Sequence, residues 1–172
     1  MQQQLETYRC DGCGTEYQVA GAEQPTVLCP DCKQVATPRG DPLARREYQV
    51  GYAKYLEARR QMTDALGQFD DGETTLARSG FNDAATEFED SVEQFRTAAR
   101  QATSDHVATP CERARKKATC LWQAVEWLSG ATYASEMGDT TRVGRYKNDA
   151  TQRLEAASDY GELPEPATLS TA

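Results

Sequence analysis

The sequence predicts a mainly α-helical protein with a small β-structured, metal-binding module at its N-terminus. Two observations predict this fold class. Four cysteines gather in two closely spaced pairs near the N-terminus, among short β-prone segments interrupted by Gly and Pro. Further along, apolar side chains recur at helical spacing between Gly and Pro interruptions. We therefore expect an irregular bundle of four or five antiparallel helices behind the N-terminal module.

The 172 residues divide into three expected parts. Residues 1–40 form the β module, residues 41–160 the helical domain, and residues 161–172 a polar, Pro-rich tail that we expect to be disordered. The strands expected in the module are Thr7–Arg9, Glu16–Val19 and Thr26–Leu28. A module of about 40 residues rarely builds an adequate core, so a metal or disulfide staple is expected there.

Start and stop signals divide the helical domain. Asp41-Pro42 predicts an N-cap followed by proline, and Asp70-Asp71-Gly72 predicts a break. Thr109-Pro110-Cys111-Glu112 has the pattern of a capping box, so a helix is expected from there to Gly138. Asp139 then caps a last helix. The apolar stripes include Tyr48, Tyr52, Tyr55, Phe81, Phe88, Phe95, Leu121, Val125, Leu128, Val143, Tyr146 and Leu154.

The four N-terminal cysteines have the spacing of a metal site. Cys10 and Cys13 form one Cys-x2-Cys pair, and Cys29 and Cys32 form another after a spacer of 15 residues. Each pair can place two thiolates at adjacent corners of a tetrahedron. Gly12 and Gly14 are expected to give the first turn positive φ angles, and Pro30 to stiffen the second. Four protein ligands leave no open position, so the expected metal is structural.

These residues carry a family resemblance. Tyr8-x-Cys10-x-x-Cys13-Gly14-x-x-Tyr17, followed by Cys29-Pro30-x-Cys32, resembles the zinc ribbons of transcription factor IIB type and rubredoxin-like modules. The resemblance implies zinc as the cofactor, with iron as the alternative because rubredoxin-like modules hold iron. Gly80-Phe81-x-x-Ala84-x-x-x-Phe88 resembles a helix of a tetratricopeptide repeat. As a whole, the chain resembles uncharacterised ribbon-plus-helix proteins of halophilic archaea.

Composition and charge limit the function classes. The net charge is −8, with 27 acidic against 19 basic residues, which argues against broad non-specific binding to polyanions. The absence of isoleucine and the excess of Arg over Lys are typical of a GC-rich genome and a salty cytoplasm. The sequence shows neither a signal peptide nor a membrane-spanning segment. We expect a cytoplasmic protein.

Basic residues are clustered, and they are candidate contacts for nucleic acid or a partner. They are Arg45, Arg46, Arg113, Arg115, Lys116, Lys117, Arg142 and Arg145. The alternative is that these residues pair with acidic side chains on solvated helix faces. Residues 70–93 form an acidic stretch that holds eight of the 27 acidic residues and a single basic one, Arg78.

Catalysis is the function class that the sequence favours least. No phosphate-binding glycine loop, nucleophile–base pair or evident small-molecule site is recognisable, and the single histidine, His106, is expected in a loop. Cys111 and Cys120 are expected to be buried. The favoured hypothesis is a non-catalytic zinc-binding adaptor whose helical domain binds a protein partner. The alternatives are a nucleic-acid-associated factor of transcription or the ribosome, and a structural subunit of a larger particle.

Overall fold

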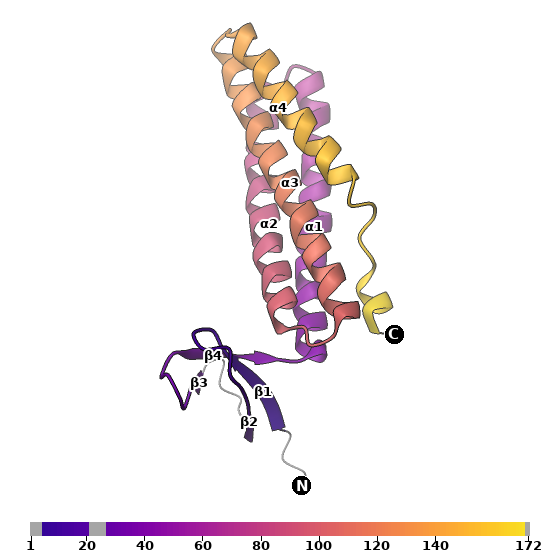
Figure 1. Ribbon diagram of the computed structural model, residues 1–172. Coiled ribbons are helices and arrows are strands. Elements are labelled where there is room, and N and C mark those ends of the chain that lie inside the picture. The colour runs from indigo at the N-terminus through magenta and orange to yellow at the C-terminus, as the bar shows by residue number, and fades with distance from the viewer. Residues whose placement is uncertain (1–4, 21–26, 171–172) are drawn as a thin grey trace.

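A computed structural model describes residues 5–20 and 27–170, and it shows a small sheet at one end of a long helical bundle (Figure 1). The elements are β1 (Leu5–Cys10), β2 (Glu16–Ala20), β3 (Val27–Leu28), β4 (Val35–Arg39), α1 (Asp41–Asp70), α2 (Thr74–Gln101), α3 (Asp105–Glu136), α4 (Thr140–Ser158) and the 3-10 helix η1 (Pro166–Ser170). The predicted class, mainly α with a small N-terminal β part, is confirmed.

The sheet is antiparallel, with strand order β2-β1-β4-β3. Its core consists of Tyr8, Cys10, Cys29 and Ala36, so two of its four buried residues are candidate metal ligands. The expected strands correspond to β1, β2 and β3, although Thr26 lies outside the described residues. Strand β4 was not predicted, because Val35-Ala36-Thr37-Pro38-Arg39 has no regular alternation and contains proline.

The bundle is held together by aromatic side chains on α1 and α2. Helices α1 and α3 both pack along α2, and α4 packs on α3. The ring of Tyr48 lies 5.1 Å from that of Phe95, and the ring of Tyr55 lies 6.1 Å from that of Phe88. All four side chains are almost fully buried, as the helical spacing predicted. A buried aromatic side chain of this kind contributes roughly 2–3 kcal/mol through apolar burial.

The predicted helix ends are correct at Asp70, Gly138 and Asp139. Helix α1 ends at Asp70, Gly138 has a φ of 72°, and the Asp139 side chain accepts a hydrogen bond from the Arg142 N–H. The predicted start at Thr109 is wrong, because α3 begins at Asp105 and carries Pro110 inside it. The extra turn buries Val107, and it also places His106 in a helix instead of the expected loop.

The helix dimensions do not support tetratricopeptide-like hairpins. Helices α1, α2 and α3 have 30, 28 and 32 residues, whereas a whole two-helix repeat has about 34. Gly80 lies inside α2 and does not begin it. A Cβ at Gly80 would come within 2.9 Å of the Ala65 Cβ, so this glycine allows α1 and α2 to approach closely.

The expectation that residues 161–172 are disordered is wrong for residues 161–170; residues 171–172 lie outside the described residues. This segment, which we call the C-terminal strap, continues from the end of α4 along the bundle towards the sheet and ends in η1 (Figure 1). Leu163 and Leu169 are buried in the bundle core. Two leucines among polar residues give no periodic signal, so the sequence could not show this packing.

Candidate metal centre

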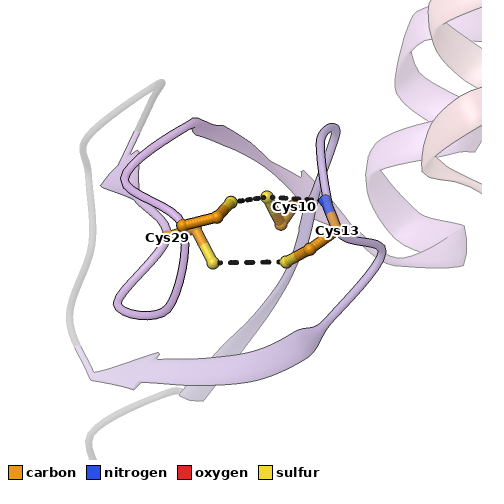
Figure 2. Close-up of side chains that lie close together, drawn as sticks. Cys10, Cys13 and Cys29 are labelled. Atoms are coloured by element: carbon orange, nitrogen blue, oxygen red, sulfur yellow. Dashed lines mark hydrogen bonds between the residues drawn. The ribbon is translucent and has the colours of Figure 1, made fainter.

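The four predicted cysteines come together at one point of the N-terminal sheet (Figure 2). Their sulfur atoms all lie within 4.8 Å of one another. Cys10 Sγ lies 3.3 Å from Cys32 Sγ, and Cys13 Sγ lies 3.6 Å from Cys29 Sγ. A tetrahedral site with metal–sulfur bonds near 2.3 Å needs sulfur–sulfur distances of about 3.8 Å. The four thiolates therefore fit one metal ion such as zinc or iron.

Two turns of the same construction present the sulfurs. In the first turn, the Cys10 N–H donates to the Thr15 carbonyl and the Gly14 N–H donates to the Cys10 carbonyl. In the second turn, the Cys29 N–H donates to the Gln34 carbonyl and the Lys33 N–H donates to the Cys29 carbonyl. Gly14 and Lys33 occupy equivalent positions, with φ angles of 74° and 61°. The second turn thus holds a lysine in a conformation that glycine prefers.

The expectation that Gly12 has a positive φ is wrong, since only Gly14 does so in the first turn. The N–H groups of Gly12 and Cys13 instead point to Cys10 Sγ, at 3.3 and 3.4 Å. These contacts, the one from Cys13 above all, lower the pKa of the Cys10 thiol. The Thr15 hydroxyl, 3.3 Å from Cys13 Sγ, lowers the pKa of that thiol to about 6. Cys10 and Cys13 therefore favour the thiolate, the form that binds a metal. The backbone N–H of Gln34 lowers the pKa of Cys32, but the contact with Cys10 and burial outweigh it and raise that pKa to about 12.

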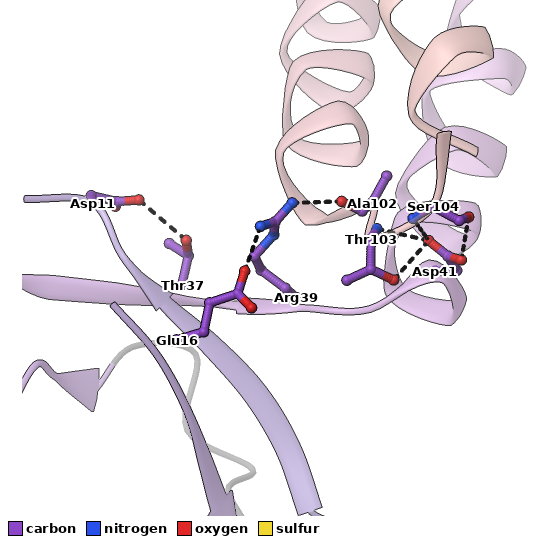
Figure 3. A network of polar contacts seen from close by, with 8 residues as sticks. All are labelled: Asp11, Glu16, Thr37, Arg39, Asp41, Ala102, Thr103 and Ser104. Atoms are coloured by element: carbon purple, nitrogen blue, oxygen red, sulfur yellow. Dashed lines mark hydrogen bonds and ion pairs between the residues drawn. The ribbon is translucent and has the colours of Figure 1, made fainter. Parts of the chain in front are cut away.

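A polar junction fixes the sheet to the bundle (Figure 3). Arg39 donates to the Ala102 carbonyl at 2.7 Å and pairs with Glu16 at 2.9 Å. Asp41 does not cap its own helix, whose N-cap is Gly40. Its carboxylate instead accepts from the N–H groups of Thr103 and Ser104, at 2.8 and 3.1 Å, and from both hydroxyls. Burial opposes ionisation of Asp41, but these hydrogen bonds outweigh it and lower the pKa to about 2.

The basic candidate residues divide into two groups. Arg45, Arg46, Arg113, Lys116 and Lys117 line the region where the C-terminal strap lies; Lys117 and Arg45 donate to the Gly161 and Leu169 carbonyls. Burial lowers the pKa of Lys117. By contrast, Arg115 pairs with Glu112 and Arg142 with Asp139, and Arg145 is exposed on α4. The structure thus brings five of the eight residues together and separates the other three from them.

The remaining candidates have structural surroundings. Cys111 is fully buried, which raises the pKa of its thiol to about 12, and Cys120 is partly buried against the core. His106 is exposed at the start of α3. Sequence reasoning missed Tyr48 as a polar group: its hydroxyl donates to the Pro164 carbonyl at 2.8 Å. Its helical spacing indicated only a core position.

Comparison of the chain with protein-family models, curated proteins and solved structures finds no match. The geometry therefore defines the class by itself: a four-cysteine metal-binding sheet joined to a helical bundle. None of the helices in residues 5–20 and 27–170 combines the length and the apolar character that a membrane span requires.

Proposed function

We propose that the protein is a non-catalytic zinc-binding adaptor, whose helical domain binds a protein partner within a larger assembly. The observation that carries the proposal is the four-thiolate site, in which Cys10, Cys13, Cys29 and Cys32 would supply all four ligands of a tetrahedral ion. Such a site leaves no position for water or substrate. Zinc, which has no redox chemistry, suits a site that maintains structure.

The junction between sheet and bundle supports the adaptor role. Arg39 of β4 donates one hydrogen bond to the Ala102 carbonyl, and Asp41 at the start of α1 accepts four from Thr103 and Ser104, so five hydrogen bonds reach the loop between α2 and α3. Since these contacts hold the sheet in one orientation, two separate surfaces can be presented to an assembly at a defined distance. Leu28 and Val35 lie opposite each other on β3 and β4, and both are exposed. An exposed apolar pair of this kind is suited to a protein contact.

The acidic face of α2 also favours a protein partner over nucleic acid. Asp83, Glu89, Asp90 and Glu93 are all exposed along this helix. Because the whole chain also carries a net charge of −8, these carboxylates would repel a phosphate backbone at this face.

The experiment that tests the proposal is purification of the tagged chain from its native host at native salt, with cross-linking and elemental analysis. We expect one zinc per chain and a stoichiometric protein partner. The control is the Leu28→Ser/Val35→Ser variant, which removes the exposed apolar pair without touching a cysteine. Iron in place of zinc would contradict the metal assignment, and a chain that enriches no protein would contradict the adaptor role.

A nucleic-acid-associated role is the second candidate, and a cleft between sheet and bundle favours it. The cleft, of about 370 Å³, is lined by Arg9, Arg39 and Arg100 near Cys10. Asp11 partly offsets this charge, 3.8 Å from Arg100. This role predicts RNA or duplex affinity that falls steeply with salt and is weakened by Arg9→Gln. No nucleic-acid binding at moderate salt would exclude this second role.

A further inference from the structure

The C-terminal strap occupies a groove between two helices that are held apart. Helices α1 and α3 both pack on α2, and they run parallel to each other with little direct contact. Helix α4 packs on α3 farther from the sheet, and its Lys147 reaches the Phe69 ring of α1 at 4.6 Å; the strap lies nearer the sheet (Figure 1). The groove is therefore a feature of α1 and α3, whereas its occupant is a segment without regular structure before η1.

The groove holds the strap mainly through its backbone. Four strap carbonyls accept hydrogen bonds from groove side chains: Gly161 from Lys117, Glu162 from Arg113 at 3.4 Å, Pro164 from Tyr48 at 2.8 Å, and Leu169 from Arg45 at 2.7 Å. Every peptide has such carbonyls. These donors thus recognise an extended chain without selecting its side chains.

Between Gly161 and Leu169, two strap side chains are deeply buried. Leu163 is 6% exposed and Leu169 is 5% exposed, and both belong to the bundle core. Glu162, Glu165, Ala167 and Thr168 point to solvent. The side-chain requirement of the groove is therefore two leucines six residues apart, with the residues between them largely free.

The charges of groove and strap are complementary. The rim carries Arg45, Arg46, Arg59, Arg113 and Lys116, with Lys117 buried below them. The strap carries Glu162 and Glu165, and the Glu162 carboxylate lies 3.5 Å from Arg59. Glu112 also lies beside Arg113 and Lys116, but it pairs with Arg115. The basic side chains of the rim therefore outnumber the two carboxylates of the strap.

The strap also leaves space on both sides. A cavity of about 410 Å³ lies between Tyr160 and α3, beside Arg113 and Lys116. Another of about 420 Å³ lies between η1 and α1, beside Arg45 and Arg46. The unfilled volume and the excess of basic side chains indicate that the groove can accommodate a larger and more acidic segment than the strap.

We propose that the groove between α1 and α3 is a docking site for an extended, acidic peptide segment of a protein partner, carrying two leucines six residues apart, and that the strap occupies it in cis. This inference rests on the proposed adaptor function and names the chemistry of its partner. The strap competes at an effective concentration in the millimolar range, so a partner segment has to bind more tightly or act when the strap is released. The buried leucines and carbonyl-directed donors favour a peptide over a nucleic acid.

The test uses the full chain and a fluorescein-labelled peptide with the sequence of residues 159–170. In the Leu163→Asp/Leu169→Asp variant the strap should leave the groove, and peptide affinity should rise at least about tenfold over the wild-type chain. The matched control is the same peptide with both leucines replaced by asparagine, which should not bind the opened variant. Equal, absent or leucine-independent peptide binding would overturn the proposal, as would binding of a single-stranded oligonucleotide in place of the peptide.

Methyl NMR of the wild-type chain provides a second measurement that needs no strap variant to fold. Saturating peptide should displace the strap and shift the methyl resonances of the buried Leu163 and Leu169 towards their solvent-exposed positions, without changing that of Val92 in α2. Unchanged leucine resonances would overturn the proposal. A cellular partner that is retained equally by the wild-type chain and by Tyr48→Phe/Arg45→Gln would leave the adaptor function standing and contradict the groove alone.

Discussion

The N-terminal sheet and the helical bundle of this protein are stabilised in opposite ways. The sheet has a core of four residues, and Cys10 and Cys29 among them are metal ligands in our proposal. The bundle has a continuous core that extends through all four long helices and includes Tyr48, Tyr55 and Phe88. We therefore expect the sheet to depend on a bound metal, and the bundle to depend on buried apolar area and to tolerate metal loss.

Removal of a ligand is the strongest way to separate the two regions. Cys29→Ser should abolish stoichiometric metal binding and unfold the sheet, because structural zinc contributes about 10–16 kcal/mol in small zinc-dependent modules. Elemental analysis and amide NMR spectra should show the loss, while far-UV circular dichroism of the helices should change little. Cys120→Ser, outside the site, is the control. A Cys29→Ser chain that keeps its full metal content would contradict the assignment.

A core truncation should have the reverse effect. Phe88→Ala should destabilise the bundle by about 3–5 kcal/mol, because it leaves a cavity beside Tyr55, and it should leave one metal per chain. Urea unfolding followed by circular dichroism measures the change. Leu56→Ala, at a position that is 46% exposed, should shift stability by no more than about 0.5 kcal/mol. Loss of metal in Phe88→Ala would show that the two regions are not independent.

The junction sharpens the comparison because it belongs to both regions. Asp41→Asn should cost about 1.5–3 kcal/mol at neutral pH, since it removes the charge from hydrogen bonds to Thr103 and Ser104. The folded pKa of Asp41, about 2, lies below the unfolded value of about 3.9. Its contribution is therefore complete above about pH 4 and is lost as the pH falls towards 2.

Denaturant unfolding at several pH values should show this window. The difference between the wild-type chain and Asp41→Asn should shrink as the pH falls below 4. A difference that stays constant with pH would mean that the carboxylate charge is not what stabilises the junction.

The smallest expected effect compares the two metal-binding turns. Lys33→Gly should stabilise the second turn by up to about 1 kcal/mol, because glycine adopts a positive φ without strain. Loss of the Lys33 Nζ bond to the Pro30 carbonyl offsets part of this gain. Gly14→Ala at the equivalent position should destabilise by about 1 kcal/mol. Competition with a chelator measures both changes, and effects of equal sign would contradict the equivalence of the turns.

Local patterns were sufficient for much of the fold and for the four ligands. Two Cys-x2-Cys pairs predicted the cluster because each pair needs only one tight turn, and the apolar stripes predicted the buried faces because helix geometry is periodic. The breaks at Asp70 and Gly138 were predictable for the same reason. The start of α3 was not predictable from local patterns, because burial of Val107 extends the helix in the N-terminal direction, to Asp105, ahead of the capping signal at Thr109.

The sequence by itself thus determined the candidate metal ligands, the helical faces and the order of the elements, which depend on neighbours in the chain. Tertiary structure decided where Asp41 and the basic residues act. Asp41 bonds to residues more than 60 positions away, and Arg45, Arg113 and Lys117 meet the strap across the groove between α1 and α3. Such contacts depend on how helices pack, and a strap with two leucines has no period that a sequence pattern can detect.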